Sequence, residues 1–185
     1  MTIKQTSFQG LDAVEVTTSK LQLAVVTEFG PRIAHLGVPG GDNILLWEPG
    51  EHTRGKWDLR GGHRVWVTRP GADECEDTYA TDNGACDVEL LDDGVRITGA
   101  ENPVNRTRRG VCITQVDETT VEVDNFVVNT GEMLYSGGLW ALTCTVPASD
   151  TRYAVPLGDG SDWDTFTLVA FRKWAGHGEG GFNDP

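Results

Sequence analysis

The stretch "VCITQVDETTVEVDNFVV", residues Val111–Val128, decides the fold class of this chain. Apolar and polar side chains alternate on both sides of Asp117-Glu118, and a period of two is typical of a strand that buries one face. The acidic residues between the two halves are of a type that favours a chain reversal. The stretch therefore predicts two long strands that pair around Asp117-Glu118.

Short segments of the same kind fill most of the sequence, separated by Gly, Pro, Asn and Asp turn signals. The segment 88–98, "VELLDDGVRIT", is typical of a hairpin with Asp93-Gly94 at its turn. No window of helix length carries an apolar period of 3.6 residues. We therefore predict an all-β protein, an antiparallel β-sandwich. Besides these stretches, the predicted strand segments are residues 13–18, 21–28, 32–38, 43–47, 137–146, 152–158 and 165–174.

Two regions have little strand signal, residues 48–57 and residues 70–85. The second region is long for a connection within a compact domain, and long loops of this kind often carry function. The alternative is an excursion over the surface. Both interpretations stay open at this point.

Composition limits the function classes. The chain has 185 residues and a net charge of −13, so we expect one domain over residues 1–185 and no nucleic-acid partner, because phosphate backbones require a basic surface. No apolar run is long enough for a membrane helix, and the N-terminus lacks a secretory pattern, which favours a cytoplasmic protein. The four cysteines form no C-x-x-C pair, so we expect free thiols, and we expect no metal site and no cofactor. They are Cys75, Cys86, Cys112 and Cys144.

The stretch "WDLRGGHRVWVTRP", residues 57–70, is the main candidate for a site. Gly61 and Gly62 permit positive φ angles and close approach to the backbone. Arg60 and Arg64 offer forked donors that suit carboxylates, phosphates or vicinal hydroxyls. The stretch is therefore either a ligand-binding strand entrance or a tight turn that carries solvated charges.

Alternation along this strand places His63 and Val65 on one face, and Arg64 and Trp66 on the other. Arg64 is interpreted either as a ligand donor or as a structural ion-pair partner. Trp66 is either a platform for a sugar ring or a core residue. No catalytic residue is assigned; His63 is the candidate for that role, with a structural histidine as the alternative.

Three further residues complete the candidate ligand site. Arg32, in "GPRIAH", is interpreted as a ligand contact or as the partner of an acidic residue. Asp82, near the end of the long loop, can accept hydroxyl donors or form a turn. Trp140, after "SGG", is either a platform for a sugar ring or a core residue.

The order of several motifs resembles the galactose-mutarotase-like, or aldose-epimerase-like, superfamily. They are "EFGPRIAHLGVPGGDNILLW", "GGHRVW", "VELLDDGVRIT", "VVNTG" and "GGLWALT…VPLG". In order and spacing they are most similar to an uncharacterised bacterial family, the DUF4380 type. The resemblance implies the supersandwich fold of that superfamily and a sugar or sugar-acid ligand, and it places Arg32 in the ligand cleft.

The sequence departs from the resemblance in two places. Family members continue past "GHGEGGFNDP", so the resemblance implies that this chain is an N-terminal portion of a longer domain whose last strands are missing. We expect the open sheet edges to be covered by a second copy of the chain. Thr143 stands where aldose epimerases carry a histidine, so this chain lacks the intact acid–base pair that epimerisation needs.

Two hypotheses for the function follow. The first is a carbohydrate-binding or carbohydrate-modifying protein. The second is a non-catalytic all-β module for structure or interaction, in which the arginines are structural. Arginines that converge on a cleft favour the first hypothesis, and scattered, ion-paired arginines favour the second.

Overall fold

The computed structural model describes residues 1–54, 57–68, 76–146 and 148–149. By its contacts the chain divides into two units, Met1–Val146 and Pro147–Pro185, and the fold given below is that of the first unit. The predicted strands at 152–158 and 165–174 lie outside the described residues. The prediction of one domain over the whole chain also extends beyond them.

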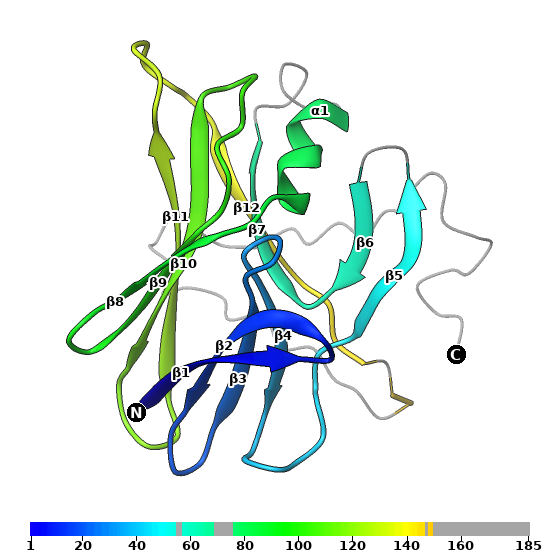
Figure 1. Cartoon of the computed structure of the whole chain (residues 1–185), viewed down its shortest axis with the longest axis vertical. Helices are drawn as coiled ribbons and strands as arrows, with labels where there is room; N and C mark the ends of the chain where they lie inside the picture. Colours follow the sequence, from blue (N-terminus) through cyan, green and yellow to red (C-terminus); the bar gives the residue numbers. More distant parts are fainter. Residues whose placement is uncertain (55–56, 69–75, 147, 150–185) are drawn as a thin grey trace, which may run out of the picture. The chain divides into compact units, whose positions relative to one another are not determined.

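An antiparallel sheet of six strands forms the first layer of the unit (Figure 1). In its order, β1-β2-β3-β4-β7-β12, the N-terminal strands lie beside β7 and β12, the two strands that carry candidate site residues. In the pair β7–β12, Trp140 lies opposite Trp66 and Thr143 lies opposite His63. The strands are β1 (Thr2–Phe8), β2 (Leu11–Thr17), β3 (Gln22–Val26), β4 (Arg32–Gly37), β7 (His63–Thr68) and β12 (Gly138–Thr143).

The second layer is an antiparallel sheet of four strands in the order β11-β10-β9-β8. It contains most of the stretch 111–128: β10 (Thr107–Gln115) pairs along its whole length with β11 (Val121–Asn129). The predicted hairpin is also present, with β8 (Asp87–Leu90) and β9 (Gly94–Thr98) on either side of a short turn. Both hairpins are confirmed, but the turn of the second lies at Asp92-Asp93, one residue earlier than predicted, because Leu91 N–H donates to the carbonyl of Gly94 and Gly94 begins β9.

The hydrophobic core lies between these two sheets. Val14, Leu23 and Val25 of the first sheet pack against Val111 and Ile113 of the second, and all five are at most 1% exposed. The alternating pattern of each strand supplies this inner face, because successive side chains point to opposite sides of a sheet. The protein is therefore an all-β antiparallel sandwich, as the sequence predicts. Among the described residues, no helix is long and apolar enough to cross a membrane.

The region 48–57, with its weak strand signal, is a strand for most of its length. Here β5 (Trp47–Arg54) pairs with β6 (Trp57–Gly61) as a two-stranded antiparallel sheet. The segment "EPGE" contains Pro and Gly, which are depleted in strands, so its propensity argues against the structure it adopts. The strand is therefore formed by backbone pairing with β6, although its sequence has no alternating apolar pattern.

The predicted strand at 43–47 is wrong for most of its length. Leu45 makes only an isolated bridge to Thr145. Instead of a ladder, the side chain of Asn43 holds this segment: its Oδ1 accepts the backbone N–H groups of Leu36 and Leu45, and its Nδ2 donates to the carbonyl of Ala34. Backbone hydrogen bonds of the same run go to several segments, from Ile44 N–H to Leu36 and from Leu46 N–H to Cys144, so the run forms no continuous ladder with one strand.

The described part of the long region 70–85 contains two short helical turns, α1 (Glu76–Tyr79) and the 3₁₀ turn η1 (Ala80–Asn83). Figure 1 shows α1 in green, next to β7 and β6. The turn η1 carries the buried Asp82. This region is therefore not a plain surface excursion, because it brings a carboxylate into the interior.

The strands β12 and β11 end their sheets within the described residues. Exposed apolar side chains lie along both of these edge strands: Val127 is 38% exposed, Val128 45% and Leu139 44%. Unpaired edges with apolar side chains are surfaces that favour association with another strand. Coverage by a second copy of the chain stays a prediction.

Candidate functional site

Gly61 and Gly62 connect β6 to β7 and adopt positive φ angles of 77° and 70°. A Cβ atom on Gly61 would collide with the carbonyl oxygen of Leu46, and one on Gly62 with the carbonyl oxygen of Ile33. Gly62 N–H also donates to the Leu46 carbonyl at 2.7 Å. The backbone that approaches this glycine pair is therefore the protein's own, and this close approach draws β4, β6 and β7 together.

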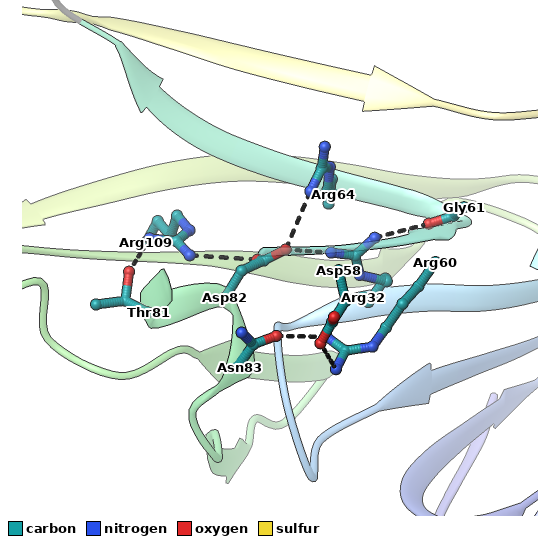
Figure 2. A network of polar contacts seen from close by, with 9 residues as sticks. All are labelled: Arg32, Asp58, Arg60, Gly61, Arg64, Thr81, Asp82, Asn83 and Arg109. Carbon is teal, nitrogen blue, oxygen red and sulfur yellow. Dashed lines mark hydrogen bonds and ion pairs between the residues drawn. The ribbon is translucent and has the colours of Figure 1, made fainter. Parts of the chain in front are cut away.

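The buried carboxylate of Asp82 lies at the centre of a group of arginine side chains (Figure 2). Its Oδ2 pairs with Arg32 of β4 and, at 3.2 Å, with Arg64 of β7, and its Oδ1 pairs with Arg109 of β10 at 3.2 Å. Each of the four residues is at most 6% exposed. We call Arg32, Arg64, Arg109 and Asp82 the arginine cluster. It joins both sheets through η1.

The second contacts of the guanidinium groups fix their positions. Arg32 donates to the carbonyl of Gly61 at 3.0 Å, and Arg109 donates to the hydroxyl of Thr81 at 2.9 Å. The Nε atoms of Arg32 and Arg109 are buried and have no hydrogen-bond partner in the part of the chain that the structure describes. Buried donors without acceptors are uncommon in proteins and mark places where an acceptor is favoured.

The electrostatics of the cluster are dominated by the arginines. Burial by itself would raise the pKa of Asp82, but the charges of Arg32, Arg109 and Arg64 outweigh it and hold that pKa below its ordinary value. Burial, with Arg32 nearby, lowers the pKa of Arg64 to about 10. Asp82 is therefore ionised at neutral pH. The charges of Arg32 and Arg109 alone already exceed the charge of this carboxylate.

Arg60 lies beside the cluster rather than in it. Its guanidinium donates to Asn83 at 2.7 Å and to Asp58 at 2.6 Å, and it lies 3.8 Å from the centre of the Phe29 ring. Its side chain is 11% exposed, more than those of the three cluster arginines. Arg60 and Asn83 therefore form a polar rim next to the buried charges, as Figure 2 shows.

The two candidate tryptophans contact each other. Trp66 and Trp140 lie edge to face with ring centres 5.4 Å apart, and Trp66 also contacts Tyr79 at 4.4 Å. Trp66 is 2% exposed, and the Arg64 guanidinium lies 3.2 Å from its ring centre. Trp66 is therefore a core residue whose face is covered by an arginine, whereas Trp140 is half-buried and keeps some exposed surface.

His63 is separate from the arginine cluster, as the alternation along β7 predicts. Its Nδ1 lies 2.8 Å from the hydroxyl of Thr143 on β12, and its Nε2 lies 3.1 Å from Oδ1 of Asn125 on β11. The structure thus brings Arg32, Arg64 and Asp82 together, places Arg60 beside them and Trp140 behind Trp66, and puts His63 on the opposite face of β7.

The sequence analysis missed Arg109 and Asn125. Both lie on the inner face of the second sheet: Arg109 is two residues before Val111, and Asn125 is two residues after Val123. A polar residue in phase with the buried side chains of a strand is a signal that could have identified each of them. Their partners come from other elements and leave no local signal.

No protein-family model matches this chain, and no curated protein and no solved structure matches it. The fold and the site therefore define only a class, an all-β antiparallel sandwich with buried arginines around one carboxylate. Among the described residues no group of three or more His, Cys, Asp or Glu side chains could hold a metal ion.

The described cysteines are free thiols that differ in their surroundings. Burial raises the pKa of Cys86 to about 12, whereas Cys144 is exposed. Near pH 8, only about one part in ten thousand of a thiol with such a pKa is the reactive thiolate. We expect iodoacetamide to alkylate Cys144 and to leave Cys86 unmodified in the folded protein, as read by peptide mass mapping. Equal alkylation of both thiols without denaturant would contradict this assignment.

Proposed function

We propose that the chain binds a small sugar acid at the arginine cluster. One observation carries the proposal: Arg32 and Arg109 are both buried, share the carboxylate of Asp82, and each keep a buried Nε donor that finds no acceptor among the described residues. A ligand carboxylate supplies both the missing acceptors and the missing negative charge. Guanidinium groups suit this ligand because their fork matches the two oxygens of a carboxylate.

The polar rim and the aromatic residues support a polyhydroxylated ligand rather than a simple anion. Asn83 and Asp58, which hold Arg60, offer oxygen acceptors for hydroxyl groups. Trp140 is a half-buried residue that contacts Trp66, and amphipathic rings of this kind pack against sugars. The resemblance of the sequence to mutarotase-like proteins points in the same direction. The proposal includes binding and no reaction at this cluster.

A titration with sugar acids tests the proposal. We expect D-glucuronate, D-galacturonate or D-gluconate to raise the melting temperature of the protein, because a ligand that binds only the folded state stabilises it by about 2.7 kcal/mol at a hundredfold excess over its Kd. Glucose and galactose, which lack the carboxylate, are expected to leave the melting temperature unchanged. Acetate separates recognition of a bare carboxylate from recognition of the sugar.

Arg109→Lys separates ligand binding from fold support. Lysine keeps the positive charge beside Asp82 but removes the forked donors and Nε. We expect the affinity for the sugar acid to fall about 10-fold to 100-fold, the scale of one hydrogen bond to a charged group. Arg108→Lys is the matched control, because Arg108 is the neighbouring residue of β10 and pairs with the exposed Asp87. Equal affinity of both variants, or the absence of any sugar-acid shift in the wild type, would overturn the proposal.

The second hypothesis, a non-catalytic all-β module, also has an observation in its favour. Arg32, Arg64 and Arg109 all pair with Asp82 in the interior and tie the two sheets to η1, which is a structural arrangement. Under this hypothesis, sugar acids and neutral sugars alike leave the melting temperature unchanged. The same titration therefore decides between the two functions.

A further inference from the structure

A second polar arrangement lies on the opposite face of β7 from the arginine cluster. Thr143, His63 and Asn125 form a hydrogen-bonded series across three strands: Thr143 Oγ1 lies 2.8 Å from His63 Nδ1, and His63 Nε2 lies 3.1 Å from Asn125 Oδ1. Thr143 comes from β12, His63 from β7 and Asn125 from β11 of the other sheet. We call these three residues the Thr-His-Asn series.

The atoms in contact fix the direction of the hydrogen bonds. Asn125 Oδ1 can only accept, so the neutral imidazole carries its proton on Nε2 and donates it to Asn125. Nδ1 then bears the lone pair and accepts the hydroxyl proton of Thr143. A hydroxyl that donates to an imidazole, itself oriented by a third polar group, is the arrangement that activates an oxygen nucleophile.

The threonine is accessible to a substrate. Thr143 is exposed, and His63 and Asn125 are half-buried, so the imidazole is held in place beside an exposed threonine. Ala141 and Leu139 share the face of β12 that carries Thr143, and Val127 shares the face of β11 that carries Asn125. Leu139 and Val127 are 44% and 38% exposed. An apolar surface thus accompanies the hydroxyl, as the acyl part of an ester requires.

We propose that the Thr-His-Asn series is an acyl-transfer site that hydrolyses small esters. Thr143 Oγ attacks the ester carbonyl and forms the new C–O bond, while its proton passes to His63 Nδ1. The bond to the leaving alcohol or phenol breaks, and the leaving oxygen takes the proton from His63, which returns the imidazole to its neutral form. Water then attacks the acyl-threonine, His63 accepts its proton and returns a proton to Thr143 Oγ, and the carboxylic acid is released. Asn125 is a positioning residue that holds the imidazole.

This inference is independent of the sugar-acid proposal. Arg64 and Trp66 point to one face of β7, and His63 points to the other, so the two sites use opposite faces of one strand. A sugar-acid titration that fails leaves the acyl-transfer site untouched. Loss of esterase activity in a variant of the series likewise leaves sugar-acid binding unchanged.

The test uses p-nitrophenyl acetate with the full chain in a Cys144→Ser background, because Cys144 is an exposed thiol next to Thr143. We expect release of p-nitrophenol and, after rapid acid quenching, a mass increase of one acetyl group that peptide mapping assigns to Thr143. Thr143→Val removes the hydroxyl and keeps the shape of the side chain, and it is expected to abolish the adduct. Thr143→Ser is expected to retain it. Thr120→Ala, which changes an exposed hairpin threonine far from a histidine, is the matched control and keeps full activity.

Variants of the other two residues test their roles. His63→Gln is expected to lower the rate of p-nitrophenol release by at least about 100-fold, the scale of general-base catalysis. Asn125→Leu is expected to lower that rate, and Asn125→Asp to restore it, because the aspartate keeps an acceptor for Nε2–H. A merely structural role for Asn125 would not give this rescue, since both variants would change only the melting temperature. Acetylation confined to lysines or to the N-terminus, or equal rates for wild type and Thr143→Val, would overturn the proposal.

Discussion

Asp82→Asn is expected to destabilise the fold by about 3–5 kcal/mol, because it removes the carboxylate that Arg32, Arg64 and Arg109 share. Asparagine keeps the shape of the side chain, so the loss reports the charge rather than the packing. Three buried guanidinium groups would then repel one another, and the Nδ2 donors of the new amide would add to that repulsion. For a chain of this size the melting temperature falls by roughly 6–20 °C.

Asp87→Asn is the matched control for this change. Asp87 also pairs with an arginine, Arg108, but its side chain is 77% exposed, and exposed ion pairs contribute at most about 1 kcal/mol. Chemical denaturation of wild type and both variants at neutral pH measures the difference. Equal, small losses in the two variants would show that the arginine cluster does not support the fold.

The dependence of stability on pH in the acid range tests the same carboxylate, because Asp82 becomes protonated there. The pKa of Asp82 is depressed in the folded state, so its contribution to stability is present above the ordinary carboxyl pKa and is lost as the pH falls through the depressed value. Asp82→Asn should therefore lose most stability at neutral pH. Toward strong acid the wild type approaches the variant, because there Asp82 is protonated too.

Gly62→Ala is the second change with a large expected effect, a loss of about 3 kcal/mol or more. Its φ angle of 70° costs an alanine about 1–2 kcal/mol, and the added Cβ meets the carbonyl oxygen of Ile33, which is backbone and cannot rotate away. Relief of this collision moves β4 away from β7. That movement also displaces Arg32, whose Cγ lies 3.4 Å from the position of the new Cβ.

Gly40→Ala isolates the contribution of the collision. Gly40 has nearly the same φ angle, 73°, but nothing lies within 4 Å of a Cβ at that position. We expect this variant to lose only the conformational part, about 1–2 kcal/mol. Urea unfolding of both variants gives the comparison. Two equal losses would show that the β4–β7 approach has little energetic weight.

The sequence predicts the fold class well because local patterns carry it. The alternation on either side of Asp117-Glu118 and the Asp-Gly turn signal each predict a hairpin without help from distant residues, although the second turn lies one residue earlier, at Asp92-Asp93. The errors fall where tertiary contacts override the pattern. The apolar run at 43–47 bonds to Asn43 and to several different segments instead of one strand, and pairing with β6 turns the polar segment at 48–54 into a strand.

The candidate site likewise has a part that the sequence predicts and a part that only tertiary contacts decide. Sequence reasoning identifies Arg32, Arg64 and Asp82 and the opposite orientation of His63, since residue type and alternation along one strand suffice for that. It assigns the close approach at Gly61 and Gly62 to a ligand, whereas the carbonyls of Leu46 and Ile33 occupy that space.

Residue type and periodicity by themselves determined that this chain is an antiparallel sandwich and that Arg64 and His63 lie on opposite faces of one strand. Only the tertiary structure decided which polar residues meet. Arg109 joins Arg32 and Arg64 on Asp82 because a 3₁₀ turn brings that carboxylate between two sheets, and Asn125 reaches His63 across the sandwich. The physical reason is that burying a charge requires a partner, and nothing in the local sequence of a strand says which distant element supplies it.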